Sequence, residues 1–253
     1  MKTLVIVVIL AVIGGGIYYI LKDGVDQSLI EINEEKWSDS DSYEVIGYSV
    51  EGREIQAYRF GAGEKKLVYI GALHGGYEWN TALLSYELID YLTANPDSVP
   101  SGIEVIVIPV ANPDGLYKVV GTSERFSAED APQFNFASEV SLEDRVVSGR
   151  FNANGVDLNR NFDCKWQVKA TWRSFSVNAG TAAFSEPEAI VLRDFFLAES
   201  PKAAVFFHSA SNGVFTSFCD GDALSETVEL LETYSRTSGY PLYDSYKYYA
   251  VTG

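Results

Sequence analysis

The chain has 253 residues, of which 47% are hydrophobic and 13% aromatic, enough to form a large core and to exclude wholesale disorder. Its 35 acidic and 19 basic residues give a net charge of −16, which argues against nucleic-acid binding because phosphates require a basic face. The length favours one α/β domain with an N-terminal appendage.

The first distinctive segment is an uncharged stretch of nineteen residues from Thr3 to Leu21, TLVIVVILAVIGGGIYYIL. At about 1.5 Å per residue this stretch comes close to spanning a bilayer core of roughly 30 Å. We therefore expect residues 3–21 to form a single membrane-spanning helix. The alternative is a cleaved secretory signal, although the apolar region of a signal is usually shorter and no clear cleavage site follows here.

The charges around this stretch indicate which side of a membrane the body occupies. Lys2 precedes the stretch and five acidic residues follow it before residue 36, with Lys22 as a weak counter-signal. The positive-inside rule weakly favours a body outside the cytoplasm. We expect a membrane anchor in residues 1–24, an acidic linker in residues 25–42 and an extracytoplasmic domain in residues 43–253. Secretion after signal cleavage is the alternative.

The first half of the domain predicts a hairpin, a buried strand and a helix. Residues 43–61, YEVIGYSVEGREIQAYRFG, indicate two strands around a turn at Glu51-Gly52. Residues 65–73, KKLVYIGAL, form a short apolar run that is typical of a buried strand. A helix should follow from Trp79 to about Asn95, with one face formed by Leu84, Leu88 and Leu92.

The second half continues the alternation of strands and helices. Buried strands are predicted within residues 102–115 and 202–211, and helices within residues 184–200 and 223–239. The first of these helices should begin with a capping box from Ser185 to Glu188. The alternation predicts a three-layer α/β/α sandwich around a mainly parallel mixed sheet.

The chain contains only two histidines, His74 and His208, and each follows a predicted buried strand. Ligands gather at the carboxyl ends of the strands in such sheets, so both imidazoles should lie at the same edge. Glu78 follows His74 by four residues. Two imidazoles and one carboxylate form the ligand set of a catalytic zinc site with a water as fourth ligand. The alternative is that each is an ordinary polar residue at a strand end.

A series of short motifs extends this interpretation over roughly residues 43–253. In chain order, the motifs are IGYSVEGREI, GALHGGYE, NPDG, GVDLNRNF, FSEPEA, FFHS and YAVTG. This ordered series resembles that of the zinc metallocarboxypeptidases, the carboxypeptidase A-like group. One departure is that the usual H-x-x-E spacing is H-x-x-x-E here. The extra residue requires a local bulge, which Gly75 and Gly76 could supply.

The resemblance implies a role for several residues of these motifs. His74, Glu78 and His208 would bind one zinc ion per chain. Asp157 would be the carboxylate that orients His74 and fixes its tautomer. Asn159 and Arg160 would hold the terminal carboxylate of a peptide, which a planar guanidinium can bind through two hydrogen bonds.

Two further catalytic residues follow from the same resemblance. Arg150 best matches the arginine that polarises the scissile carbonyl and stabilises its oxyanion, with Arg125 and Arg145 as rivals. Tyr249, in YAVTG, matches the tyrosine that closes over the substrate. Surface salt bridges for Arg150 and Arg160, and an ordinary strand position for Tyr249, are the alternatives.

The implied function is that of a zinc metalloprotease, a carboxypeptidase that hydrolyses the C-terminal peptide bond of peptides. The general-base glutamate of the family lies on a strand shortly past the YAVTG tyrosine. We therefore expect this residue, the last strand and the last helix to lie beyond Gly253, and residues 1–253 to be inactive. Two alternatives are an amidohydrolase of the same superfamily acting on peptidoglycan stem peptides or N-acyl amino acids, and a non-catalytic membrane-tethered peptide-binding module.

The two cysteines, Cys164 and Cys219, permit at most one internal disulfide. Cys164 follows the arginine motif, and Cys219 follows the strand that ends on His208. Both should therefore lie near the same rim of the domain, and we expect them to form a disulfide. Two separate free thiols are the alternative.

Overall fold

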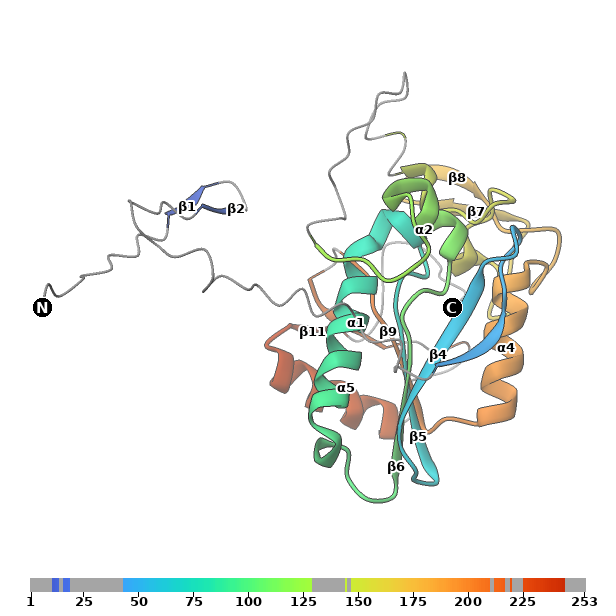
Figure 1. Cartoon of the computed structure of the whole chain (residues 1–253). Helices are drawn as coiled ribbons and strands as arrows, with labels where there is room; N and C mark the ends of the chain where they lie inside the picture. The colour runs from blue at the N-terminus through green and yellow to red at the C-terminus, as the bar shows by residue number, and fades with distance from the viewer. Residues whose placement is uncertain are drawn as a thin grey trace, which may run out of the picture. The chain divides into compact units, whose positions relative to one another are not determined.

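The computed structural model describes residues 43–128, 144, 147–209, 212–216, 219 and 225–243, and the short stretches 11–13 and 16–18 (Figure 1). By their internal contacts the residues divide into two units, Met1–Asp41 and Ser42–Gly253. Tyr249 and the YAVTG motif lie outside the described residues, as does Arg145.

In the first unit, the described residues form two short strands. β1, Ala11–Ile13, pairs antiparallel with β2, Gly16–Tyr18. For these residues the expected single helix over 3–21 is wrong; the other residues of that stretch lie outside the described part. β-branched residues favour strands, and glycine costs about 1 kcal/mol in a helix interior. Among the described residues, no helix combines the length and the apolar character needed to cross a membrane.

The second unit is organised around a five-stranded mixed sheet. The strands occur in the order β3, Tyr43–Tyr48; β4, Glu54–Gly61; β6, Ile103–Ile108; β5, Lys65–Ile70; and β9, Ala203–Phe206. β3 and β4 form the expected hairpin, and β4 pairs antiparallel with β6. β6, β5 and β9 run parallel to one another, so their carboxyl ends lie at the same edge.

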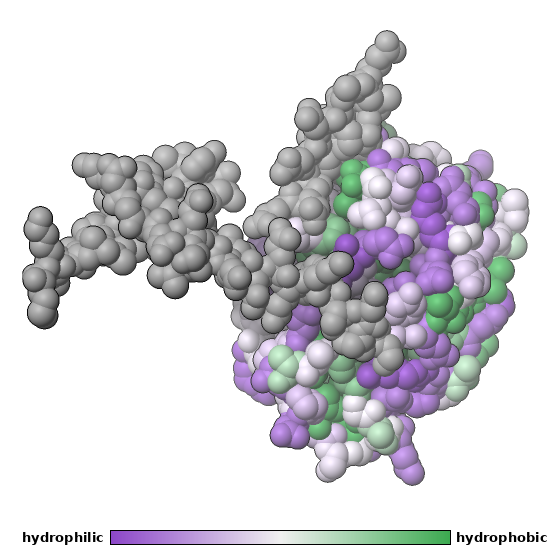
Figure 2. Space-filling view, in the orientation of Figure 1, coloured by the Kyte–Doolittle hydropathy of each residue, from purple (hydrophilic) through white to green (hydrophobic). Residues whose placement is uncertain are grey.

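Helices cover both faces of this sheet, which gives the three layers expected from the sequence (Figure 1). α1, Trp79–Ala94, and α5, Ser225–Ser238, lie on one face, and α4, Pro187–Glu199, lies on the other. Alternate residues of β5 face opposite ways: Val68 and Ile70 join the core under α4, whereas Tyr69 packs toward α1. Where described residues are visible in Figure 2, hydrophilic residues cover much of the surface and hydrophobic ones gather in small, separate areas.

The face that α1 buries differs from the predicted leucine face. Leu92 is buried, but Leu84 is 45% exposed, and the helix turns Ala82 and Ser85 toward the sheet. Small side chains are needed here because α1 passes close to the end of β5. A Cβ atom on Gly71 would lie 2.4 Å from Oγ of Ser85. Close packing thus determines which face is buried, and the leucine spacing predicted it wrongly.

The predicted capping box at the start of α4 does not form. The helix begins at Pro187. Oγ of Ser185 donates a hydrogen bond to the Glu186 carboxylate at 2.8 Å and accepts none from a helix amide. Glu188 turns inward and accepts a hydrogen bond from the amide of Val50 at 3.1 Å. Proline supplies no N–H at the first helical position, and the partly buried Val50 amide takes the Glu188 carboxylate as its acceptor.

Shorter elements complete the described part. They are η2, Gly75–Glu78; η3, Pro96–Ser98; α2, Pro113–Val120; η4, Leu158–Arg160; the antiparallel pair β7, Lys169–Trp172, and β8, Phe175–Asn178; and the parallel pair β10, Val214–Phe215, and β11, Leu242–Tyr243. η2 follows the carboxyl end of β5, and α2 follows the carboxyl end of β6. Both therefore lie at the sheet edge where the predicted site residues should gather.

Candidate metal centre

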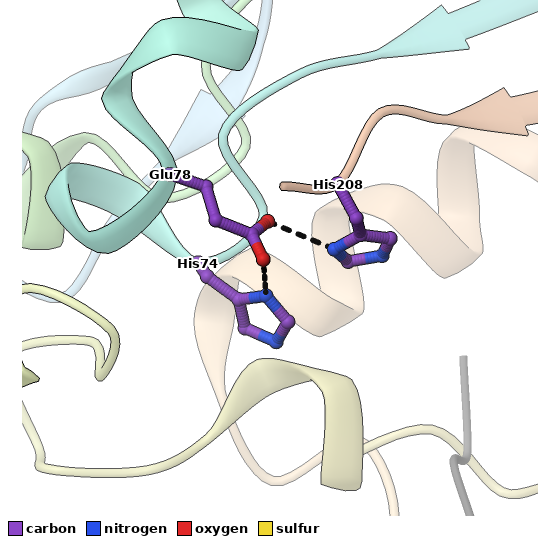
Figure 3. Close-up of side chains that lie close together, drawn as sticks. All are labelled: His74, Glu78 and His208. Carbon is purple, nitrogen blue, oxygen red and sulfur yellow. Dashed lines mark hydrogen bonds and ion pairs between the residues drawn. The ribbon is translucent and has the colours of Figure 1, made fainter. Parts of the chain in front are cut away.

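The two histidines meet at the carboxyl ends of two neighbouring parallel strands. His74 lies four residues beyond the end of β5, and His208 lies two residues beyond the end of β9. β5 and β9 are paired, with Ile70 opposite Phe206. The centroids of the two imidazole rings are consequently 4.8 Å apart (Figure 3).

The Glu78 carboxylate lies between the two imidazoles (Figure 3). Its Oε1 is 3.0 Å from Nδ1 of His74, and its Oε2 is 2.8 Å from Nδ1 of His208. One candidate ligand atom from each residue lies within 4.8 Å of the others. His74 and Glu78 are each only 3% exposed, whereas the side chain of His208 is 32% exposed. The three residues thus form a cluster that is buried on one side and accessible on the other.

η2 accommodates the extra residue between His74 and Glu78. It forms a tight 3₁₀ turn in which Gly75 has a φ of +46°, in the region that favours glycine. A Cβ atom on Gly75 would lie 2.7 Å from the carbonyl carbon of Gly115, so only glycine allows η2 to pack this closely on α2. The turn brings Glu78 back toward His74, as the glycine pair in the sequence suggested.

The charges at this cluster fix its protonation. Burial lowers the pKa of His74, but the carboxylates of Glu78 and Asp157 outweigh burial and the nearby Arg150, and the pKa ends above its usual value. Burial also raises the pKa of Glu78, but His74 and His208 hold it well below its usual range. At neutral pH, Glu78 is therefore a carboxylate placed between two imidazoles.

The donor set fits a zinc ion. It combines two imidazole nitrogens and one carboxylate, the combination found in three-ligand zinc sites. In addition, Nδ1 and Nε2 of His74 are buried and make no hydrogen bond of good geometry to any residue that the structure describes, although the carboxylates of Glu78 and Asp157 lie near them. A cation between His74, Glu78 and His208 could bind Nδ1 of His74, the buried nitrogen that faces Glu78, and would balance the charge of the Glu78 carboxylate.

Asp157 lies on the other side of the His74 ring. Its Oδ1 is 3.4 Å from Nε2 of His74 and accepts a hydrogen bond from the amide of Asn159 at 3.1 Å. Its Oδ2 accepts from Nε of Arg150 at 3.0 Å. Burial raises the pKa of Asp157, but His74, Arg150 and Arg160 hold it well below its usual range. Asp157 is therefore an ionised carboxylate in contact with the candidate ligand His74.

Of the three candidate oxyanion arginines, the structure brings Arg150 to this cluster. Its guanidinium is buried against Asp157, and its central carbon lies 4.4 Å from the ring centroid of Trp172. Arg125 instead pairs with Asp90 on α1 and lies over the ring of Tyr86. Arg145 lies outside the described residues.

The two residues expected to hold a terminal carboxylate lie on η4, directly after Asp157. Arg160 is buried, and its Nε donates to the carbonyl oxygen of Thr171 at 3.1 Å. The side-chain oxygen of Asn159 is buried and has no hydrogen-bond partner among the described residues. These positions place an amide and a guanidinium beside the cluster, with Arg160 oriented by the backbone.

The structure joins Cys164 and Cys219 in a disulfide with a Cα–Cα distance of 5.3 Å. This separation is within the normal range for a disulfide. Cys164 follows Arg160 by four residues, and Cys219 lies in the segment that follows His208. The bond therefore links the segment that follows Arg160 to the segment that follows His208.

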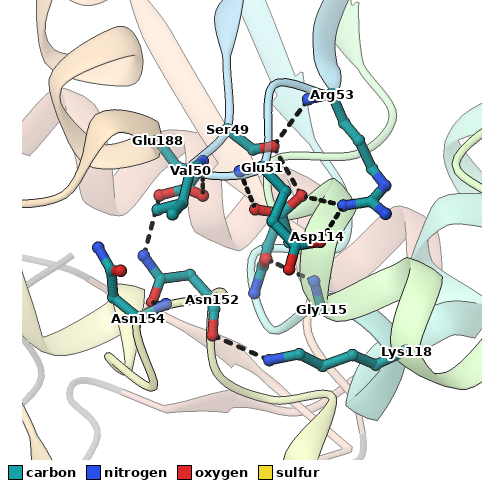
Figure 4. Close-up of polar contacts among 11 residues, drawn as sticks. Ser49, Val50, Glu51, Arg53, Asp114, Gly115, Lys118, Asn152, Asn154 and Glu188 are labelled. Atoms are coloured by element: carbon teal, nitrogen blue, oxygen red, sulfur yellow. Dashed lines mark hydrogen bonds and ion pairs between the residues drawn. The ribbon is translucent and has the colours of Figure 1, made fainter.

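A buried polar cluster that sequence reasoning missed supports the residues around Arg150 (Figure 4). Asp114 accepts hydrogen bonds from Oγ of Ser49 at 2.7 Å and from the amide of Glu51 at 3.0 Å. It also forms an ion pair with Arg53 at 2.7 Å. Asp114 belongs to the NPDG motif, and its role is to connect the start of α2 with the β3–β4 turn.

Asn152 connects the same cluster to α4 (Figure 4). Its Nδ2 donates to Glu186 at 2.8 Å and to Glu188 at 3.0 Å, and its carbonyl oxygen accepts from Lys118 at 3.1 Å. Burial raises the pKa of Glu188 above its usual value. Because Asn152 lies between Arg150 and Asp157 in the chain, these contacts fix the segment that carries both. In the sequence, the polar residues of SEPE, residues 185–188, could have indicated these contacts, but a helix cap explained the same residues equally well.

Comparisons with known proteins were made for the whole chain. A family model described as zinc carboxypeptidase matches residues 27–252. Gamma-D-glutamyl-L-diamino acid endopeptidase 1 from Lysinibacillus sphaericus is 26% identical over 220 residues, which cover 81% of this chain and 54% of that protein. Carboxypeptidase B from Helicoverpa zea is 29% identical over 214 residues, which cover 79% of this chain and 46% of that protein.

A solved structure supports the same relationship. The crystal structure of carboxypeptidase A from Helicoverpa armigera matches with a TM-score of 0.54 and 25% sequence identity, over 75% of this chain and 46% of that one. This chain therefore spans about half the length of the curated relatives it matches. The similarity confirms both the resemblance noted in the motifs and the α/β fold class expected from the sequence.

Proposed function

The chain belongs to the zinc carboxypeptidase family, and we propose that it takes part in zinc-dependent hydrolysis of the C-terminal peptide bond of peptides. The observation that carries this proposal is the convergence of His74, Glu78 and His208. Two residues of this set, His74 and Glu78, are buried, and a shared metal ion would account for an imidazole and a carboxylate buried side by side. His208 is accessible, as a ligand at the floor of a substrate site should be.

In this proposal, His74, Glu78 and His208 hold the zinc ion. When bound, the ion polarises the scissile carbonyl and lowers the pKa of a water molecule. Asp157 faces Nε2 of His74 and keeps the ring oriented with Nδ1 toward Glu78. The proposed metal is Zn²⁺, one per chain.

The arginines supply substrate binding and charge stabilisation. Arg160, with Asn159, binds the terminal carboxylate of the peptide through its guanidinium fork. Arg150 stabilises negative charge on the scissile carbonyl oxygen. Its buried Nη2 lies 2.9 Å from Oδ2 of Asp157 but makes no hydrogen bond of good geometry to the described residues, and its second N–H can reach that oxygen. Closure of Tyr249 over the substrate stays a prediction from the sequence.

The described residues include no evident general base for the proton-transfer step. Among them, the carboxylates within ion-pair distance of the two histidines are Glu78 and Asp157. Glu78 is assigned to the metal, and Asp157 is engaged by Arg150. A positioned base contributes about 10²–10⁴-fold to such a reaction. We therefore propose that residues 1–253 alone bind zinc and peptide but hydrolyse peptides slowly.

A second candidate function is hydrolysis of peptidoglycan stem peptides or N-acyl amino acids by the same metal centre. The observation in its favour is the match, over 81% of this chain, to a protein named gamma-D-glutamyl-L-diamino acid endopeptidase. A non-catalytic peptide-binding module is the third candidate. Membrane attachment through residues 1–24, with the domain outside the cytoplasm, stays a prediction from the sequence.

Binding and product analysis of the zinc-loaded chain test these candidates together. The ligands are peptides with a free C-terminal carboxylate, the same peptides as C-terminal amides, and γ-D-glutamyl peptides. We expect the free acids to bind at least tenfold more tightly than the amides and to release a single C-terminal residue slowly. Equal binding of acids and amides would contradict the carboxypeptidase proposal. Cleavage confined to γ-D-glutamyl bonds would favour the second candidate, and binding without products the third.

A further inference from the structure

Arg173 occupies an unusual backbone position for an arginine. β7 and β8 are joined by a two-residue turn, Arg173-Ser174, with Trp172 paired to Phe175 across it. The φ of Arg173 is +54°, in the left-handed region that glycine adopts most easily. A large side chain at this position requires contacts that hold it, and backbone strain of this kind is concentrated at functional sites.

Two aromatic residues provide those contacts. The guanidinium carbon of Arg173 lies 5.1 Å from the ring centroid of Trp172, and its Nη2 donates to the hydroxyl of Tyr77 at 3.4 Å. Tyr77 packs edge-on against Trp172, with ring centroids 5.2 Å apart. Arg173 itself is exposed. The aromatic pair thus holds an accessible cation in place.

The same aromatic pair connects Arg173 to the candidate metal centre. Trp172 and Tyr77 also contact the guanidinium of Arg150, at 4.4 Å and 5.6 Å from the ring centroids. Arg150 pairs with Asp157, which faces His74. Tyr77 directly precedes the candidate ligand Glu78 in the chain. Arg173 is therefore at the rim of the candidate site, one aromatic layer away from Arg150.

The charge of this region contrasts with that of the chain. Residues 150–173 contain five basic and two acidic residues, a net charge of +3, whereas the whole chain has a net charge of −16. Arg150 is paired with Asp157, and Arg160 is bonded to backbone oxygen. The described residues give Arg173 aromatic and hydroxyl partners but no carboxylate. Its charge is available to an anionic group from outside.

We propose that Arg173 binds a second carboxylate of the substrate, in addition to the terminal one, and that the site thereby selects acidic peptides. The inference rests on the proposed function, because it assumes that peptides bind at this centre. One N–H of the Arg173 guanidinium bonds to Tyr77, and the stacking on Trp172 leaves its other N–H donors available for a carboxylate. The Tyr77 hydroxyl, in contact with Nη2, orients that fork.

Paired peptides test this inference by binding measurements alone, with the zinc-loaded chain of residues 1–253. Each pair carries glutamate or glutamine at one of the three positions before the C-terminal residue and is otherwise identical. We expect the native protein to bind the glutamate peptide about 3- to 10-fold more tightly at one or more positions. Salt should weaken this preference, because the proposed contact is exposed.

Two variants and a control assign the preference to one side chain. Arg173→Gln and Arg173→Gly should both abolish it, and glycine suits the turn, so the hairpin is retained. Arg193→Gln removes the same charge from α4, where Arg193 pairs with Asp194, and should leave the preference unchanged. Circular dichroism establishes that the variants are folded.

The outcomes separate this inference from the proposed function. Equal binding of the glutamate and glutamine peptides by the native protein would overturn the role of Arg173 and leave the carboxypeptidase proposal in place. A preference that survives in both Arg173 variants would also overturn it. Failure of every peptide with a free terminal carboxylate to bind would overturn both proposals.

Discussion

The guanidinium of Arg150 and the carboxylate of Asp157 form a buried ion pair, with Nη2 at 2.9 Å and Nε at 3.0 Å from the same oxygen, Oδ2. The other oxygen of Asp157 faces Nε2 of His74 at 3.4 Å. One carboxylate therefore connects the proposed oxyanion arginine to a proposed zinc ligand. Removal of either partner of this pair should affect both stability and the metal site.

Arg150→Met should destabilise the metal-free protein, because the ionised Asp157 loses its buried partner. We expect the free energy of unfolding to fall by about 3–5 kcal/mol, measured by urea denaturation. Arg193→Met is the control, since the side chain of Arg193 is 37% exposed and its loss should change stability by less than about 0.5 kcal/mol. A loss below about 1 kcal/mol for Arg150→Met would show that the ion pair is not needed for folding.

The sequence predicted most of the fold, because the strands of the sheet and the helices that pack on it have clear hydrophobic patterns. It did not predict which face of α1 is buried. Leu84 has the expected spacing, but Ala82 and Ser85 are buried in its place because Gly71 lies close to the helix. Hydrophobic periodicity describes one helix in isolation, whereas the buried face depends on how closely its neighbours approach.

The candidate ligands were predictable for a similar reason. Parallel strands place His74 and His208 at one edge, and Glu78 lies close to His74 in the chain. The polar cluster of Asp114, Asn152 and Glu188 was not predictable, since its contacts join segments that are far apart in the sequence. Side-chain pairing between distant segments leaves no periodic pattern.

His208→Ala should greatly reduce bound zinc, because one of the three proposed ligands is lost. His208 is accessible and lies beyond the end of β9, so the substitution should leave the fold intact. Metal analysis after dialysis against zinc measures the effect, and we expect much less than one ion per chain. Ser209→Ala, one residue further along, is the matched control and should retain zinc. Full zinc content in the His208 variant would exclude this residue as a ligand.

Zinc affinity should depend on pH through His74. Its pKa is raised, so His74 keeps its proton to a higher pH than a free imidazole, and zinc must displace that proton. Binding should therefore weaken as the pH falls through the pKa of His74, by up to about tenfold per pH unit. Zinc titrations between pH 8.5 and pH 5.5 measure this dependence.

Asp157→Asn provides the matched variant for these titrations. Removal of one of the two carboxylates that raise the pKa of His74 should move the pH dependence to lower pH. The same substitution should weaken zinc binding at high pH by about 10–100-fold, because Asp157 no longer fixes the orientation of the ring. An affinity independent of pH in the native chain would argue against His74 as a ligand.

Removal of the Cys164–Cys219 disulfide should destabilise the domain. The two cysteines are 55 residues apart in sequence, and closure of such a loop corresponds to about 4 kcal/mol in the chain-entropy model. The double variant Cys164→Ser, Cys219→Ser should therefore lose up to about 4 kcal/mol in free energy of unfolding. Urea denaturation of the native chain with and without reductant is the parallel measurement. Coincident curves for oxidised and reduced protein would contradict the expectation.

Gly75→Ala should affect both folding and metal binding, because two separate constraints apply at this position. The φ of Gly75 is +46°, which an L-residue adopts at a cost of about 1–2 kcal/mol. A Cβ atom would also lie 2.7 Å from the carbonyl carbon of Gly115, on a neighbouring backbone segment that cannot easily move aside. Overpacking of this kind adds about 1–3 kcal/mol.

Gly155→Ala separates the two constraints. Gly155 also has a positive φ, +73°, but a Cβ atom there would meet nothing within 4 Å. Its substitution should cost only the strain of a positive φ. Gly75→Ala should therefore lower the free energy of unfolding by about 1–3 kcal/mol more than Gly155→Ala does. Displacement of η2 moves Glu78 relative to His74, so zinc affinity should fall in the Gly75 variant alone. Equal effects of the two substitutions on stability and on zinc binding would show that the close contact between η2 and α2 does not position the ligands.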